Sequence, residues 1–130
     1  MKLLLATQNK DIFSDLVETL SVWGYSVTTA EDGYDALIEL QNGDSAPVMA
    51  IIDNDLPSME GTEVVRRLRH RVDAPYQYLI LLGSSDDLED RLISMDMGAD
   101  VYVNNTPLNL VELRVHLQVG RRIHQEWSCK

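Results

Sequence analysis

The sequence predicts one α/β domain in which a parallel sheet lies between two layers of helices. Three observations support this fold class. The chain has 130 residues, enough for one domain with a single sizeable core. Five short apolar segments alternate with five segments of helical periodicity, and short connections join them. Residues 49–52 form an unbroken apolar run between turn residues, which is typical of a strand buried on both faces of a parallel sheet.

Each strand is expected where apolar, aromatic or β-branched residues gather between turn signals. The third strand opens after Pro47 and runs up to Asp53, the first acidic residue of the loop that follows. The five expected strands cover residues 3–6, 25–29, 48–52, 78–82 and 101–103. In parallel α/β sheets, binding and chemistry lie just beyond the carboxyl ends of the strands. Asp53 is therefore the first candidate for a functional residue.

A helix follows each strand, and a capping residue or a glycine marks its start. Asn9 and Asp32 are expected to cap the first two helices, and Gly61 to open the third. Ser85 or Asp86 is expected to cap the fourth. The fifth begins at about residue 110. The apolar positions expected to face the sheet are Ile12, Phe13, Leu16, Val17 and Leu20, then Tyr34, Leu37, Ile38 and Leu40, then Val64, Val65 and Leu68, then Leu88, Leu92, Ile93 and Met97, and finally Leu110, Leu113 and Leu117.

Composition and charge exclude several classes of function. The formal net charge of -10 argues against nucleic-acid binding, because affinity for phosphate backbones comes from clustered Lys and Arg. The lone cysteine, Cys129, excludes an internal disulfide and a Cys-based zinc site. No P-loop, dinucleotide fingerprint or nucleophile elbow is present, so we expect no enzymatic activity. No segment has the character of a signal peptide or a membrane span, so we expect a cytoplasmic location without membrane contact.

A set of landmark residues follows the strands in a characteristic order. The landmarks are Asp53 with Pro57 and Gly61 after it, residues 30–37, Gly98-Ala99-Asp100, Tyr102, Pro107, Leu110 and Leu113. Their joint order and spacing, over about residues 2–123, resemble the response-regulator receiver domains of the CheY-like family. The resemblance implies a flavodoxin-like (βα)5 three-layer sandwich with strand order 2-1-3-4-5. It also implies a receiver-like domain over residues 1–122, with residues 123–130 extending the last helix as a linker to an effector domain.

The residues around Asp53 depart from the receiver pattern. In the family, the third-strand aspartate accepts a phosphoryl group from a histidine kinase, assisted by Mg²⁺ on an acidic pair, by a Ser or Thr hydroxyl and by a lysine. The resemblance implies that Asp53 is the phosphoacceptor position. The other positions fall on Thr7 and Gln8 for the acidic pair, Gly83 for the hydroxyl with Ser84 beside it, and Asn105 or Thr106 for the lysine. Asp55 matches a position that offers its backbone carbonyl, so its side chain does not replace the lost pair.

These departures predict a degenerate receiver, or pseudo-receiver, that acts as a phosphorylation-independent protein-interaction module. Mg²⁺ binding is expected to be weak or absent, because Mg²⁺ prefers an octahedral oxygen shell that usually includes carboxylates. The alternative is a receiver still phosphorylated on Asp53 by a histidine kinase with non-standard metal binding. A remote alternative is a flavin-binding, flavodoxin-like protein with residues 7–11 as its phosphate loop. The expected partner is a signalling protein, an effector domain or a histidine kinase.

The last helix is expected to continue beyond what is needed to cover the sheet. Ile123 and Trp127 lie past the expected edge of the domain. Residues 113–123 resemble the helical exit of receivers placed ahead of cyclic-di-nucleotide signalling domains such as GGDEF. This resemblance implies either the regulatory input domain of a larger regulator or a helix used for dimerisation. We expect a homodimer through the fourth and fifth helices.

Overall fold

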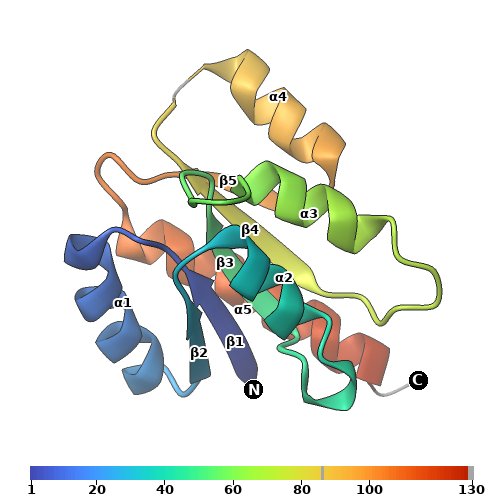
Figure 1. Cartoon of the computed structure of the whole chain (residues 1–130). Coiled ribbons are helices and arrows are strands. Elements are labelled where there is room, and N and C mark those ends of the chain that lie inside the picture. The colour runs from blue at the N-terminus through green and yellow to red at the C-terminus, as the bar shows by residue number, and fades with distance from the viewer. Residues whose placement is uncertain (86, 129–130) are drawn as a thin grey trace.

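A parallel sheet with strand order β2-β1-β3-β4-β5 lies at the centre of the fold (Figure 1). The computed structural model describes residues 1–85 and 87–128. Within these residues the strands are β1 Lys2–Ala6, β2 Ser26–Ala30, β3 Met49–Asp53, β4 Tyr78–Gly83 and β5 Val101–Asn104. The helices are α1 Lys10–Val22, α2 Gly33–Leu40, α3 Gly61–Arg69, α4 Leu88–Met97 and α5 Leu110–Ser128, with a short 3-10 helix η1 at Gly43–Ser45. The predicted (βα)5 architecture and the strand order 2-1-3-4-5 are confirmed.

Helices cover both faces of the sheet, and each face has its own core. Leu16 of α1 and Leu117 of α5 belong to one core together with Ile51 of β3. Val64 of α3 and Ile52 of β3 belong to the other core, which also contains side chains of α2. Successive residues of a strand point to opposite faces, so the unbroken apolar run of β3 supplies both cores. This explains why β3 carries no alternation of polar and apolar residues.

The register of the strands brings their carboxyl ends to one edge of the sheet. Asp53 of β3 pairs with Leu82 of β4. Gly83, the next residue of β4, pairs with Asn104 of β5. Ala6 ends β1 beside β3 on the other side. The loops that carry the predicted site residues therefore start from neighbouring points on this edge.

Local sequence signals fix the starts of the first two helices. The Asn9 side chain accepts a hydrogen bond from the Asp11 N–H (3.0 Å), and that of Asp32 accepts one from the Asp35 N–H (2.8 Å). Both predicted N-caps are confirmed. Such caps satisfy N–H groups that have no partner within the helix, so they can be recognised from sequence alone.

The start of α4 differs from the prediction. Its N-cap is Asp87, whose carboxylate accepts a hydrogen bond from the Glu89 N–H (2.9 Å). The prediction of Ser85 as the cap is wrong, and Asp86 lies outside the described residues. Ser85 instead accepts a hydrogen bond from the Asp87 N–H (3.0 Å), so it orders the loop one step before the helix.

The apolar residues of α4 also do not lie where the periodicity predicts. Leu88, Leu92 and Ile93 are 75%, 61% and 50% exposed, and Met97 is only half-buried. Ser94 is the buried residue of this helix, all of which is described. The reason is the position of α4 near β5, where its neighbours are α3 and β5 rather than the broad face of the sheet (Figure 1). The prediction that these side chains face the core is therefore wrong.

Three further apolar residues are exposed against expectation: Tyr34, Ile38 and Leu110. Tyr34 and Ile38 are one turn apart on the outer side of α2, while Leu37 and Leu40 face the core. An eight-residue helix presents few positions to the sheet, so the small Ala36 and Gly33 complete its buried face. Leu110 is the first residue of α5, where the helix has only begun to cover the sheet.

Helix α5 continues through Ser128 in the described part of the chain. Ile123, which the sequence places just past the expected edge of the domain, is half-buried and packs against the core shared by α1 and α5. The side chain of Trp127, and Cys129 entirely, fall outside what the structure describes. The division of the chain at residue 122 stays a prediction. Across residues 1–85 and 87–128, no helix combines the length and the apolar character that crossing a membrane requires.

Candidate functional site

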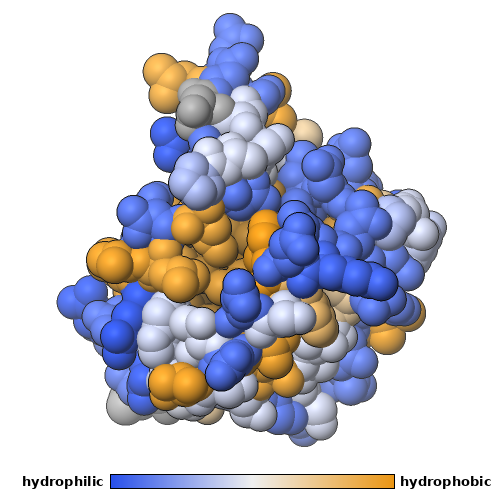
Figure 2. Space-filling model, turned by 90° about the vertical axis from the view of Figure 1, so that its left-hand side faces the viewer, coloured by the Kyte–Doolittle hydropathy of each residue, from blue (hydrophilic) through white to orange (hydrophobic). Residues whose placement is uncertain are grey.

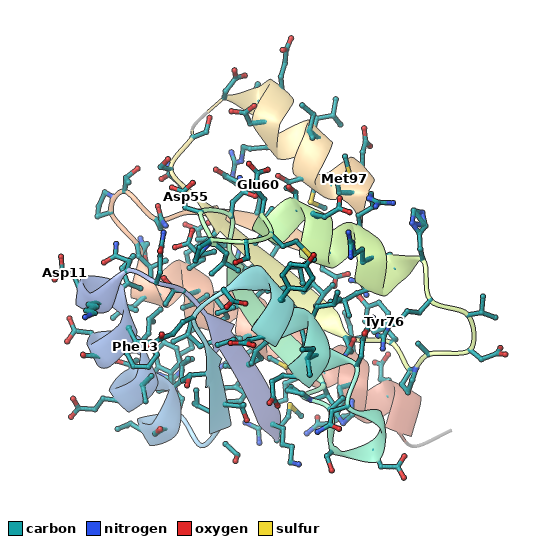
Figure 3. The ribbon with its side chains drawn as sticks, viewed as in Figure 1. Asp11, Phe13, Asp55, Glu60, Tyr76 and Met97 are labelled. Atoms are coloured by element: carbon teal, nitrogen blue, oxygen red, sulfur yellow. The ribbon has the colours of Figure 1, made fainter. Side chains whose placement is uncertain are left out.

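A polar cavity of about 740 Å³ opens beyond the carboxyl ends of the strands. The predicted site residues that line it are Gln8, Asp53, Asp55, Gly83, Ser84, Asn105 and Thr106. Thr7 joins them through a hydrogen bond to Asp53. The structure therefore brings all of the predicted site residues together. Glu60 and Asp90 also line the cavity, although sequence reasoning does not single them out (Figure 3 shows Asp55 and Glu60 at this end of the molecule).

Asp53 is buried, and both of its carboxylate oxygens have protein partners. Oδ2 accepts a hydrogen bond from the Thr7 hydroxyl at 3.1 Å. Oδ1 accepts one from the backbone N–H of Asp55 at 3.0 Å. Burial raises the pKa of Asp53, because a charge is less stable away from water, and the charge of Asp55 raises it too. The hydrogen bonds from the Asp55 N–H and the Thr7 hydroxyl partly oppose this effect.

Thr7 and Gln8 join the loop after β1 to the loop after β3. Thr7 is almost fully buried, and its hydroxyl also accepts a hydrogen bond from the Asn9 N–H at 3.1 Å. The side-chain amide of Gln8 donates a hydrogen bond to the backbone carbonyl of Asp55 at 3.0 Å. These two uncharged side chains therefore occupy one carboxylate oxygen of Asp53 and the carbonyl oxygen of Asp55.

The receiver resemblance implies a Mg²⁺ ion at this place, and the side chains present do not fit one. Mg²⁺ requires near-octahedral oxygen ligands, and in proteins these usually include carboxylates. The two oxygens that a cation would share here, on Asp53 and Asp55, already accept hydrogen bonds from Thr7 and Gln8. Among the residues that the structure describes, no group of three or more His, Cys, Asp or Glu is placed to hold a metal ion.

The position that carries a hydroxyl in the family is empty of any side chain here, because Gly83 ends β4. The neighbouring Ser84 lines the cavity and is exposed. A buried aromatic residue, Tyr102, lies beside Gly83 and bonds through its hydroxyl to the backbone of Ser85. Sequence reasoning uses Tyr102 only as a landmark. A glycine at the end of one strand facing an aromatic residue on the next is the signal that could have revealed the contact.

The lysine position has no cationic replacement. The Asn105 N–H donates a hydrogen bond to the carbonyl of Gly83 (2.8 Å). Thr106 donates from both its N–H (2.9 Å) and its hydroxyl (2.7 Å) to the Asn104 side chain. Asn105 and Thr106 both line the cavity, and none of its described lining residues is Lys or Arg. A phosphoryl group transferred to Asp53 would therefore have carboxylates and neutral groups around it, and none of the described lining residues would neutralise its negative charge.

A parallel (βα)5 sheet with a buried aspartate at the end of β3 is the arrangement that the receiver resemblance implies. Residues 3–118 match the family model described as the response regulator receiver domain. The chain therefore belongs to the response regulator receiver domain family, which serves two-component signalling. In one solved structure of the same fold, the receiver domain of the Saccharomyces cerevisiae response regulator Ssk1 is bound to the histidine phosphotransfer signaling protein Ypd1.

Known relatives support the same assignment. The chain is 31% identical over 126 residues to the response regulator protein GraR of Staphylococcus saprophyticus, covering 96% of this chain and 54% of GraR. The chain thus spans about half the length of the curated relatives that it matches. The receiver domain of the Francisella response regulator 1452 has the same fold, with a TM-score of 0.84 and 24% identity over 95% of this chain and 98% of that one. The BeF3-activated DrrB receiver domain gives a TM-score of 0.78 and 28% identity over 93% and 97% of the two chains.

Proposed function

We propose that this receiver domain is a pseudo-receiver, a protein-interaction module that works without phosphorylation of Asp53. The observation that carries the proposal is the occupation of the cation position by Thr7 and Gln8, whose neutral donors bind the oxygens of Asp53 and Asp55. Phosphoryl transfer depends on positioning and on neutralising the charge of the transferring oxygens. Each lost electrostatic contact of this kind commonly costs several kcal/mol. Without the metal pair, the hydroxyl and the lysine, transfer to Asp53 should be slower by orders of magnitude.

One observation favours the alternative, a receiver still phosphorylated on Asp53. The carboxylate keeps the family position at the end of β3 and lines a cavity open to solvent. A phosphoryl donor could reach it if the hydrogen bond from Thr7 opened. The membership of the chain in the receiver family leaves the flavin-binding alternative without support.

Incubation with a small-molecule phosphoryl donor distinguishes these two functions. Acetyl phosphate and Mg²⁺ are added to the protein, and intact mass is followed over time beside the DrrB receiver domain as a positive control. We expect the DrrB domain to gain a phosphoryl group while this chain does not. A mass increase in this chain that the Asp53→Asn variant lacks would establish the alternative.

We also propose a homodimer through α4 and α5, because both helices expose apolar side chains. The exposed residues are Leu88, Leu92, Ile93 and Met95 on α4 and Leu110, Val111 and Val115 on α5. Figure 2 shows hydrophobic side chains gathered below the projecting α4. Helix α4 with its N-cap has four acidic residues, Asp87, Glu89, Asp90 and Asp96, and one basic residue, Arg91, whereas α5 has Arg114, Arg121 and Arg122 with Glu112 and Glu126. A two-fold arrangement that crosses α4 of one copy with α5 of the other would bury the apolar residues and pair opposite charges.

Sedimentation equilibrium tests the dimer. Leu92→Glu should convert the dimer to a monomer, because it places a charge in the apolar contact. Val22→Glu is the matched control, since Val22 is 78% exposed but lies on α1. A wild-type protein that stays monomeric at high concentration would contradict the proposal, and so would an equal effect of the two variants.

We propose that this receiver controls an effector, which is a second domain of a larger regulator. GraR carries nearly as much chain again beyond the matched region. The resemblance of residues 113–123 to receivers that precede GGDEF domains suggests one kind of effector. In this arrangement α5, which continues to Ser128 in the described part of the chain, would connect the receiver to its effector.

A further inference from the structure

The ring of Tyr102 fills the space beside Gly83. Tyr102 lies on β5 and is 6% exposed. A Cβ atom added to Gly83 would lie 2.7 Å from both Cε2 and Cζ of the ring, and closer still to the hydroxyl oxygen. Such separations are below those found for real Cβ atoms. Tyr102 in this position and any side chain at residue 83 therefore exclude each other.

Hydrogen bonds connect Tyr102 to the start of α4. The Tyr102 hydroxyl accepts a hydrogen bond from the Ser85 N–H and donates one to the Ser85 carbonyl, both at 3.1 Å. The Ser85 hydroxyl accepts from the N–H of Asp87, and Asp87 caps the helix. The guanidinium of Arg91 lies 5.8 Å from the centre of the Tyr102 ring, within range of a cation–π contact. One buried side chain of β5 thus sets the conformation of the β4–α4 loop and the first turn of α4.

These contacts are separate from those of Asp53. The hydrogen-bond partners of the Asp53 carboxylate are Thr7 and the Asp55 N–H. The described partners of Tyr102 are Ser85 and Arg91, so the two sets have no residue in common. Gly83, Ser85 and Tyr102 line the same cavity as Asp53. Because residue 83 is glycine, it has no side chain that could transmit a change at Asp53 to the Tyr102 ring.

We propose that Gly83 and Tyr102 form a matched pair that holds the β4–α4 loop and the start of α4 in one conformation, whatever the state of Asp53. The inference rests on the proposed function, because it explains how a receiver can present an unchanging α4 surface without phosphorylation. It also means that restoring the family hydroxyl at residue 83 would displace Tyr102 rather than repair the site.

NMR of 3-fluorotyrosine-labelled protein tests the matched pair. The ¹⁹F signal of Tyr102 is assigned by its absence in Tyr102→Phe, and amide exchange reports on α4. We expect Asp53→Asn and Asp53→Glu to leave the Tyr102 signal unchanged. We expect Gly83→Ala to shift that signal and to lower the exchange protection of the first turn of α4 by about thirtyfold, as the loss of two hydrogen bonds predicts. Ser84→Ala, a change to an exposed neighbour, is the control and should alter neither readout.

Two further variants keep the inference testable if Gly83→Ala folds poorly. Tyr102→Phe keeps the ring but removes both bonds to Ser85, so α4 protection should fall while the fold remains. Tyr102→Leu added to Gly83→Ala should restore folding, because the smaller side chain makes room for the new methyl group. A Tyr102 signal unchanged by Gly83→Ala, or shifted by the Asp53 variants, would overturn the inference. If beryllofluoride binds at Asp53 without moving the Tyr102 signal, the proposed function fails and the matched pair stands.

Discussion

Replacing Thr7 and Gln8 by aspartates should turn the pocket beside Asp53 into a Mg²⁺ site. The double variant Thr7→Asp/Gln8→Asp restores the acidic pair of the receiver family beside Asp53. It also removes the two donors that now bind the oxygens of Asp53 and Asp55. We expect the stability of the double variant to depend on Mg²⁺, whereas that of the wild-type protein should not.

The magnitude follows from the contacts that change. Each neutral hydrogen bond that is lost costs about 1 kcal/mol. A carboxylate at residue 7 would stand near that of Asp53, where two charges about 4 Å apart repel by roughly 1 kcal/mol in water and roughly 4 kcal/mol near a protein surface. Thr7 and Asp53 are both buried, so the larger value applies. Without Mg²⁺ the double variant should therefore lose roughly 6 kcal/mol, a large part of the stability of a small domain.

Mg²⁺ binding should restore part of the stability that the double variant loses. At a free Mg²⁺ concentration ten times the dissociation constant, binding to the folded state adds about 1.4 kcal/mol. For a chain of this size that corresponds to a rise in Tm of about 5 °C. Urea and thermal denaturation are measured with and without Mg²⁺, with NaCl at matched ionic strength to remove the effect of screening. If the double variant is unfolded without Mg²⁺, the same measurement reports Mg²⁺-dependent folding.

The control is Thr7→Asn/Gln8→Asn, which has nearly the same shape without the charges. It should lose the hydrogen bonds but gain nothing from Mg²⁺. Two results would refute the reasoning. Stabilisation of the wild-type protein by Mg²⁺ as large as that of the aspartate variant would show that Thr7 and Gln8 do not block the site. An equal response of the asparagine control would show that the added charges are irrelevant.

Two further predictions concern single side chains. Asp53→Asn should raise the urea midpoint at pH 7. Burial raises the pKa of Asp53 above its ordinary value of 3.8. The protonated carboxyl therefore contributes stability that is fully present below pH 3.8, and this contribution is lost as the pH rises through the folded-state pKa. The gain from the substitution should accordingly vanish in acid. Arg69→Ala should lower the free energy of unfolding by about 3 kcal/mol, because Arg69 donates to two backbone carbonyls and to the half-buried Asp100. Arg67→Ala, which removes an exposed pair with Glu63, should leave the urea midpoint unchanged, and equal midpoints for the two arginine variants would contradict this account.

Much of the fold could be predicted because its signals are local. The apolar run of β3 and the caps at Asn9 and Asp32 depend on a few neighbouring residues, so the sequence predicts them and the structure confirms them. The exposed face of α4 could not be predicted in this way. Periodicity shows that Leu88 and Leu92 share one side of a helix, but not whether that side meets the sheet or solvent.

The candidate site likewise has one feature that the sequence predicts and others that only the structure reveals. The position of Asp53 followed from the end of an apolar strand and from its spacing to Pro57 and Gly61. Its partners could not be predicted, because the bond from Thr7 spans 46 positions in the sequence and depends on how two side chains are oriented. Likewise, a glycine at residue 83 indicates a missing hydroxyl, and only the packed structure reveals the ring of Tyr102 beside it.

The most direct test of a phosphorylation-independent receiver is an amide NMR titration of the wild-type protein with Mg²⁺ and beryllofluoride, a mimic of the phosphoryl group. The DrrB receiver domain, which has a BeF3-activated structure, serves as the positive control. Our account predicts saturable shifts in the DrrB domain and none centred on Asp53 in this chain. Saturable shifts of Asp53, Asp55 and the residues around them would contradict it.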